Sequence, residues 1–161
     1  MLKLIVATSS NDVIGVNGTL PWNCKADLQY FKEKTTNAVI IMGRTTWETL
    51  PKRPLPNRIN VVVMSNQISI PGVHVCNSFE EAVNRFPDAW IIGGASIYKQ
   101  CISLVDEIYR TIIDKPVHGP NCVKFPKIPM DIFNLTYYYS IGYQDDCKCN
   151  VIFEKFSKIG Q

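Results

Sequence analysis

The chain has 161 residues, enough for one domain with a full hydrophobic core and too few for two domains of ordinary size, so we expect a single domain over residues 1–161. Hydrophobic residues make up 46% of the chain and charged residues 19%, which excludes an intrinsically disordered protein. The net charge of +3 is too small and too scattered to indicate nucleic-acid binding.

Nothing near the N-terminus predicts export or membrane insertion. The apolar run at residues 4–7 is short and gives way at once to the polar residues 8–12. A signal peptide needs a basic start, a longer apolar stretch and a cleavage site, and a membrane-spanning helix needs roughly 20 apolar residues. We therefore expect a cytoplasmic protein without membrane contact, and a monomer as the simplest state at this size.

Buried strands alternate with helices along most of the chain, which is typical of an α/β fold with parallel strands. Strands are predicted at residues 3–8, 38–42, 60–64, 89–92 and 107–113, and helices at 25–34, 45–50, 79–85 and 95–102. Ser78 and Glu81 form a capping box before the third helix. Residues 133–143 and 147–156 predict a long antiparallel hairpin, whose Tyr137, Tyr138 and Tyr139 are expected to pack rather than to stack on bases.

Six cysteines raise the question of disulfides or zinc. Their spacings contain no C-x-x-C pair, and His74 and His118 are isolated in the sequence. The one C-x-C pair, Cys147 and Cys149, falls in a predicted strand, where both side chains would point to the same face as ordinary alternating residues. We expect reduced structural thiols, no metal site and no catalytic histidine.

Asp27 is the first candidate for chemistry. It lies four residues before Phe31 on the predicted helix, so the two side chains share one face. An aspartate at a helix start is by itself most often a favourable partner of the helix dipole. Pro21 and Trp22 just upstream indicate an apolar neighbourhood, in which a carboxylate can accept paired N–H bonds from a planar amidine-like edge.

Two strand-to-helix junctions are candidates for phosphate binding. Ligands of open α/β sheets bind beyond the carboxyl ends of the strands, where Gly93-Gly94 and Gly43-Arg44-Thr45-Thr46 both lie. Each junction alone is a weak signal: a tight turn explains Gly93-Gly94 equally well, a solvent-exposed arginine and a threonine cap explain Gly43-Arg44-Thr45-Thr46 better, and the G-x-G-x-x-G pattern is missing. Together they favour a dinucleotide. Arg58, on a proline-rich loop, could be a surface cation or a fork for a substrate carboxylate.

The chain resembles the dihydrofolate reductases. The motifs that carry the resemblance, strong from about residue 4 to 114, are Val13-Ile14-Gly15, Leu20-Pro21-Trp22, Asp27 with Leu28 and Phe31, Met42-Gly43-Arg44-Thr45-Thr46-Trp47-Glu48, Arg53-Pro54-Leu55-Pro56-Asn57-Arg58 and Ile91-Ile92-Gly93-Gly94-Ala95-Ser96-Ile97-Tyr98. The resemblance implies a central, mostly parallel eight-stranded sheet with an antiparallel C-terminal hairpin and about four flanking helices. It also implies NADPH-dependent reduction of 7,8-dihydrofolate to tetrahydrofolate, in support of one-carbon and thymidylate metabolism, and binding of antifolates.

The site residues follow from the same resemblance. The implied catalytic residues are Asp27, Leu20, Trp22 and Thr111, with Asp27 holding the pterin, Thr111 bonding Asp27, and residues 15–22 forming a lid. The implied substrate site comprises Ile5, Ala7, Asp27, Leu28, Phe31, Leu50, Leu55, Arg58, Ile92, Tyr98 and Thr111. The implied NADPH site comprises Ala7, Ile14, Gly15, Gly18, Leu20, Gly43, Arg44, Thr45, Thr46, Met64, Ser65, Asn66, Ile92, Gly93, Gly94, Ala95, Ser96, Ile97 and Tyr98, with a cis peptide between the two last-named glycines.

Two positions depart from the family pattern. Ser96 stands where many members carry an arginine for the 2′-phosphate, and residues 119–126 lack the aspartate that steadies the closed lid. The alternatives are a pyrimidine reductase of riboflavin synthesis, which would not need Asp27 and Phe31 after Pro21-Trp22, and a non-catalytic binding or structural protein that keeps the fold.

Overall fold

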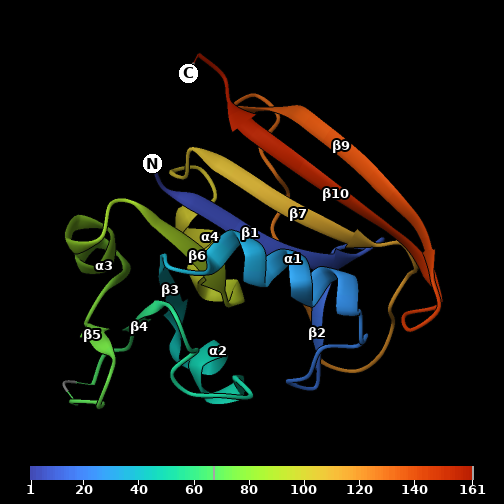
Figure 1. Cartoon of the computed structure of the whole chain (residues 1–161). Helices are drawn as coiled ribbons and strands as arrows, with labels where there is room; N and C mark the ends of the chain where they lie inside the picture. Colours follow the sequence, from blue (N-terminus) through green and yellow to red (C-terminus); the bar gives the residue numbers. More distant parts are fainter. Residues whose placement is uncertain (67, 161) are drawn as a thin grey trace.

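The structure, a computed structural model, describes residues 1–66 and 68–160 (Figure 1). Its elements are β1 (Lys3–Ser9), β2 (Val13–Val16), α1 (Lys25–Thr35), β3 (Val39–Gly43), α2 (Arg44–Thr49), β4 (Ile59–Val63), β5 (His74–Cys76), α3 (Phe79–Arg85), β6 (Ala89–Gly93), α4 (Ala95–Cys101), β7 (Glu107–Ile113), β8 (Cys122–Lys124), β9 (Phe133–Gln144) and β10 (Cys149–Lys158). Among the described residues, none of the helices is long and apolar enough to cross a membrane.

The main sheet has eight strands in the order β5-β4-β3-β6-β1-β7-β10-β9. The pairs from β5 to β7 are all parallel, whereas β10 is antiparallel to both β7 and β9. The predicted mostly parallel sheet with an antiparallel C-terminal hairpin is therefore confirmed. The chain places β6 between β3 and β1, so the ends of these three strands meet at one edge, where open α/β sheets bind ligands.

The central strands of the sheet are buried on both faces, as their unbroken apolar runs require. Alternate residues point to opposite faces, so Leu4 and Val6 pack with α3 and α4 on one face, while Ile5 packs with α1 and α2 on the other. Figure 1 shows α1 lying across the sheet in front of β1, with α4 behind. Tyr30 of α1 also stacks on Phe153 of β10, with ring centroids 4.2 Å apart, which holds the helix over the β7–β10 side of the sheet.

The capping box before α3 forms almost as predicted. The Glu81 amide donates to Ser78 Oγ at 3.0 Å, as a capping box requires. The Glu81 carboxylate reaches one residue further back than expected and accepts from the Asn77 amide at 2.6 Å. One unpaired amide of the first turn and the amide just before the cap are thus satisfied, and α3 runs to Arg85 as the sequence predicted.

Three short strands, β2, β5 and β8, were not predicted. They are only three or four residues long, and β2 and β8 pair with each other in a separate two-stranded sheet. A run this short carries too little alternation to stand out from a loop. The contact between β2 and β8 joins residues far apart in the sequence, which local patterns do not report.

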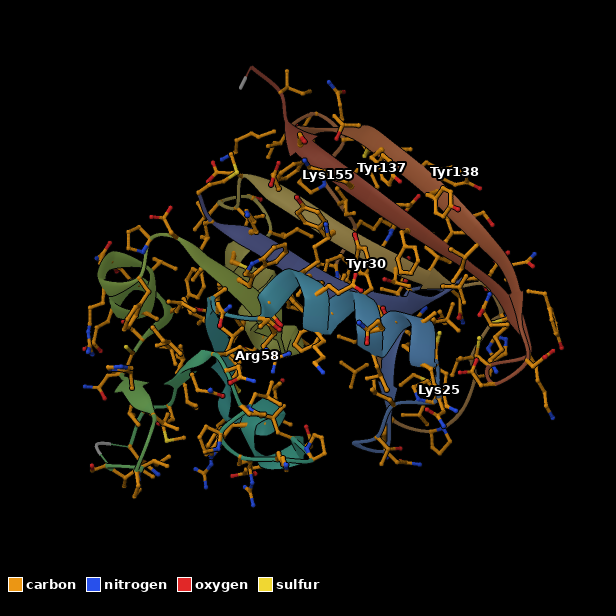
Figure 2. The ribbon with its side chains drawn as sticks, in the orientation of Figure 1. Lys25, Tyr30, Arg58, Tyr137, Tyr138 and Lys155 are labelled. Atoms are coloured by element: carbon orange, nitrogen blue, oxygen red, sulfur yellow. The ribbon has the colours of Figure 1, made fainter. Side chains whose placement is uncertain are left out.

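Two expectations about the C-terminal hairpin are wrong. Cys147 lies in the turn rather than in a strand, because β9 continues to Gln144 and β10 begins only at Cys149. The three tyrosines do not pack into a core: Tyr137, Tyr138 and Tyr139 are each more than half exposed. All three lie on β9, the edge strand of the sheet, where Figure 2 labels Tyr137 and Tyr138.

Candidate active site

Asp27 and Thr111 face each other between the first turn of α1 and the sheet. Thr111 lies on β7 with the same orientation as Tyr109, toward the α1 face, and is 1% exposed. Its hydroxyl makes no hydrogen bond of ordinary geometry to the described residues, yet it lies near enough to favour the charged form of Asp27. The Thr111 hydroxyl therefore keeps hydrogen-bonding capacity beside the Asp27 carboxylate.

Burial has the larger effect on the Asp27 carboxyl. It raises the pKa of Asp27 above the ordinary value, and the hydroxyl of Thr111 lowers it by less. A carboxyl group surrounded by apolar side chains gains more from a paired N–H donor than one in water, since the partner replaces lost hydration. Asp27 is thus suited to hold a planar group with two adjacent N–H bonds.

An apolar cluster lies beside Asp27 on the α1 face of the sheet. Five of the predicted substrate residues belong to it or pack against it: Ile5, Phe31, Leu50, Leu55 and Ile92. Ile5 is buried, and the other four are partly exposed, as expected of a wall that a ligand covers. Ala7 pairs with Thr111 in the β1–β7 register, which places it next to the polar pair. Leu28 is 57% exposed and lies outside this cluster.

Arg58 is fixed at the other end of this cluster. Its Nε donates to Thr35 Oγ1 at 2.9 Å, its Nη1 donates to the Pro56 carbonyl at 2.8 Å, and its guanidinium carbon lies 5.6 Å from the centre of the Phe31 ring. Thr35 is itself buried and donates to the Phe31 carbonyl at 2.8 Å. Figure 2 shows Arg58 on the side of α1 that faces α2. These contacts hold the Arg58 guanidinium in one orientation without a ligand, and such preorganisation favours recognition of a carboxylate.

The two predicted phosphate motifs lie against each other. They end the neighbouring strands β3 and β6, and the peptide between Gly93 and Gly94 is cis. A Cβ added at either of these glycines would lie 3.1 Å from Thr46 Oγ1 of the other motif, and Gly93 has a φ of 130°. Side chains are thereby excluded from the junction, so a ligand can approach the backbone directly.

The helices that begin at these strand ends lack side-chain caps. The N-cap residues of α2 and α4, Gly43 and Gly94, make no side-chain cap hydrogen bond, in contrast to Ser78 of α3. The first-turn amides of α2 and α4 are therefore available to anionic oxygens at the carboxyl edge of the sheet. The residues present at this edge fit the diphosphate of a dinucleotide.

The residues predicted to bind the 2′-phosphate end of the cofactor are more exposed to solvent. Arg44 makes an ion pair with Glu48, with Nε and Oε1 2.8 Å apart, and both side chains are more than half exposed. Ser65 and Asn66 follow β4 and are exposed, and Ser96 is exposed on α4. An exposed ion pair contributes little, so a phosphate group can compete with Glu48 for Arg44.

Tyr98 connects the two halves of the site. Its hydroxyl donates to the Ile5 carbonyl at 2.8 Å, and its ring meets the Phe125 ring edge-on at 5.1 Å. The side chain is buried, and burial raises its pKa far above the ordinary value. Tyr98 therefore remains protonated and serves as a wall rather than as an acid or base.

The predicted lid, residues 15–22, is tied to the late loop by contacts that the sequence did not reveal. Within the lid, Val16 and Thr19 exchange backbone hydrogen bonds of 2.9 and 3.0 Å. The link to the late loop is the pairing of β2 with β8. The Asn121 side-chain amide also donates to Asn17 Oδ1 at 3.0 Å. Asn17 and Asn121 both have positive φ angles, which asparagine tolerates in turns, but the pairing of the two side chains could not be read from the sequence. Leu20 is 61% exposed on the lid.

Comparison with known proteins agrees with this geometry. Residues 1–158 match the family model described as dihydrofolate reductase. The chain is 42% identical over 121 residues to the dihydrofolate reductase of Buchnera aphidicola subsp. Acyrthosiphon pisum, covering 73% of this chain and 75% of that protein. It is 41% identical over 120 residues to the enzyme of Haemophilus influenzae, with 73% and 74% covered.

A solved structure agrees over nearly the whole length. It is described as dihydrofolate reductase from Enterococcus faecalis complexed with NADP(H) and RAB-propyl, and it superposes with a TM-score of 0.88 at 32% identity, covering 99% of this chain and 96% of that one. The sheet order, the paired glycines and the match over residues 1–158 lead to one conclusion: this chain belongs to the dihydrofolate reductase family.

Proposed function

We propose that this protein reduces 7,8-dihydrofolate to 5,6,7,8-tetrahydrofolate with NADPH, by hydride transfer to C6 and protonation of N5 through water. The observation that carries the proposal is a partly buried Asp27 and a fully buried Thr111 beside an apolar wall, on the sheet whose strands β3 and β6 end at the glycine junction. NADPH, when bound, supplies the hydride. The chain's own residues bind, orient and shield the reactants.

Asp27 holds the pterin in this proposal. Its two carboxylate oxygens accept from the 2-amino group and ring N3, and Thr111 supports the same carboxylate from the sheet. The negative charge fixes the orientation of the ring and favours protonation at N5. No histidine or second carboxylate lies among the described residues that we assign to the pterin, so Asp27 is an anchor that aids protonation and water delivers the proton.

Apolar side chains hold the rest of the substrate. Ile5, Ala7, Phe31, Leu50, Leu55 and Ile92 line the slot, and Leu28 forms its outer edge. Arg58 binds the glutamate α-carboxylate with its pre-oriented fork. Leu20 and Trp22, on the lid, cover the reacting atoms and exclude water from them. Exclusion of water strengthens each polar contact in the closed site.

The cofactor is held along the edge of the sheet. Gly93, Gly94 and Thr46 receive the diphosphate, while Arg44 and Ser65 meet the 2′-phosphate. Ala7, Ile14 and Tyr98 form the wall at the nicotinamide end. The remaining assignments in this group are Gly15, Gly18, Leu20, Gly43, Thr45, Met64, Asn66, Ile92, Ala95, Ser96 and Ile97.

The molecular setting is part of the same proposal. We infer a cytoplasmic monomer that works as a single domain over residues 1–161, although Gln67 and Gln161 lie outside the described residues. Compounds that copy the 2-amino-pyrimidine edge of the pterin should bind at Asp27, which makes antifolates the expected inhibitors. A non-catalytic protein that kept the fold is the second candidate, favoured by the altered loop at residues 119–126.

One assay separates the two candidates. Purified protein is mixed with NADPH and 7,8-dihydrofolate, and oxidation of NADPH is followed by its loss of absorbance. We expect continuous turnover that stops when either reactant is omitted and that an antifolate abolishes. Tight binding of both reactants without turnover would leave a binding protein, and absence of binding would refute the assignment of the site.

A further inference from the structure

A second group of polar side chains lies outside the site described above, where the β9–β10 turn meets the start of α1. The Cys24 and Cys147 sulfurs and a carboxylate oxygen of Asp146 all lie within 4.8 Å of one another. Cys149 Sγ lies 3.5 Å from Cys147 Sγ. The six cysteines are free, and this sulfur separation is far beyond the roughly 2.05 Å of a disulfide.

These distances match the spacing of metal ligands. In a tetrahedral zinc site with Zn–S bonds of about 2.3 Å, neighbouring sulfurs lie about 3.8 Å apart, and a sulfur and a carboxylate oxygen lie about 3.5 Å apart. The Cys147–Cys149 separation is already within about half an ångström of that value. Each pair among Cys24, Cys147 and Asp146 lies within 4.8 Å and must close by at most about 1.3 Å to reach these values. Cys149 lies outside this group, farther than 4.8 Å from Cys24 or Asp146, so its side chain must rotate further to complete the site.

The turn itself creates the pair of sulfurs. Lys148, between the two cysteines, has a φ of 57°, which bends the backbone so that Cys147 and Cys149 approach each other. In an extended strand, side chains two residues apart would stand roughly 6.5 Å apart. The expectation of an ordinary strand pair therefore missed the close approach of these two sulfurs.

The surroundings support a bound cation. Asp146 Oδ2 accepts from the Lys25 amide and Oδ1 accepts from the Cys147 amide, both at 2.8 Å, so the carboxylate is held in place from two sides. Figure 2 shows Lys25 at the start of α1, beside the β9–β10 turn. Lys115 Nζ donates to the Cys147 carbonyl at 2.7 Å and offers a positive charge that balances a thiolate-rich complex.

The site is accessible from solvent on one side. The three thiols are nearly buried while Asp146 is exposed, so an ion can enter from the carboxylate side.

We propose that Cys24, Cys147, Cys149 and Asp146 form a tetrahedral Zn²⁺ site that fastens the β9–β10 turn to the start of α1. The protons of the three thiols leave to solvent as the three Zn–S bonds form, and the ion keeps its oxidation state throughout. Cys24 directly precedes α1, the helix that holds Asp27, so a bound ion would stabilise the end of the helix on which the proposed substrate anchor lies.

The test uses the untagged full chain, freed of metal by a chelator and kept reduced with a phosphine. Zn²⁺ is titrated in competition with a chromophoric chelator. We expect one Zn²⁺ per chain and a raised Tm in its presence. Cys149→Ser should weaken binding at least about tenfold, and Asp146→Asn should weaken it too, while the matched control Cys122→Ser keeps the wild-type affinity.

Co²⁺ provides a second measurement that requires no variant to fold. In the wild-type chain Co²⁺ should give intense d–d bands of tetrahedral coordination and a sulfur-to-metal charge-transfer band. The proposal is overturned by a stoichiometry near zero, by an octahedral Co²⁺ spectrum, or by unchanged Zn²⁺ affinity in a folded Cys149→Ser. None of these readouts needs dihydrofolate or NADPH, so they fail or succeed independently of the proposed reaction.

Discussion

The Asn121 side-chain amide donates to Asn17 Oδ1 at 3.0 Å and ties the predicted lid to the late loop, beside the β2–β8 ladder. The family pattern places an aspartate in this loop to steady the lid, and that residue is missing here. A neutral, exposed hydrogen bond contributes about 0.5–1.5 kcal/mol net, so the tether is weak but sufficient to change a lid equilibrium several-fold.

Removal of this tether should slow turnover. We expect Asn121→Ala to change kcat or the KM for NADPH by a factor of about 2 to 10, because it costs about 0.5–1.5 kcal/mol of lid closure. Steady-state kinetics measure the change, with Asn134→Ala on the exposed edge strand β9 as the control. Identical kinetics in Asn121→Ala and wild type would show that the β2–β8 ladder alone positions the lid.

Arg58 should act on substrate affinity rather than on the chemical step. Arg58→Lys replaces a fork that Thr35 and Pro56 orient with a point charge, at a cost of about 1.5–3 kcal/mol, so the KM for dihydrofolate should rise roughly 10- to 100-fold with kcat little changed.

Two controls sharpen this prediction. Arg53→Lys, on the same loop, should leave the KM unchanged. Reduction of 7,8-dihydropterin, which lacks the glutamate, should proceed equally well in Arg58→Lys and wild type. A defect of the same size with both substrates would mean that Arg58 supports the fold rather than the carboxylate.

The ionised carboxylate of Asp27 should lower the free energy of unfolding at pH 7. Its pKa is raised above 3.8 in the folded protein by burial, so the folded state binds more protons than the unfolded state between these two values. Stability therefore falls as pH rises from about 3.8 through the folded-state pKa, and Asp27→Asn should be more stable than wild type at pH 7 and lose that advantage near pH 4.

Thermal unfolding across this pH range measures the effect. Asp146 gives a control of opposite sign, because backbone amides of Lys25 and Cys147 lower its pKa. The stabilisation by the ionised Asp146 is fully present above the ordinary aspartate pKa, and it is lost as pH falls through the folded-state pKa. Asp146→Asn should therefore destabilise the metal-free protein at pH 7. An Asp27→Asn variant less stable than wild type at pH 7 would contradict the predicted direction.

The glycine junction should tolerate no side chain. A Cβ at Gly93 would lie 3.1 Å from Thr46 Oγ1, and its φ of 130° is costly for other residues, so Gly93→Ala should lower the free energy of unfolding by about 1–3 kcal/mol and abolish NADPH binding. Gly142→Ala also has a positive φ but open space around its Cβ. Denaturant unfolding should show a smaller loss of unfolding free energy for Gly142→Ala than for Gly93→Ala. An equal loss would show that the contact with Thr46 does not add to the cost at Gly93.

The sequence predicted the long elements well, because β1 and β7 carry strong apolar runs and α1 has Leu28 and Phe31 at helical spacing. The roles assigned to Asp27 and to the two glycine motifs stay predictions, although the two motifs do end neighbouring strands. The sequence did not reveal the Asn17–Asn121 bond, the β2–β8 ladder or the approach of Cys24 to Cys147, since each joins residues about a hundred positions apart. The exposure of Tyr138 was missed for a different reason: alternation shows which face a side chain takes, not whether anything covers that face.

The most direct test of the proposed function compares kcat/KM for dihydrofolate in wild type and Asp27→Asn from pH 5 to 8. The amide is nearly isosteric but has no charge to orient the pterin or favour its protonation, so we predict a loss of at least about 100-fold at pH 7. The loss should shrink toward pH 5, where solution protonation of the substrate compensates. Undiminished turnover by a folded Asp27→Asn at pH 7 would contradict the role of Asp27 as the substrate anchor.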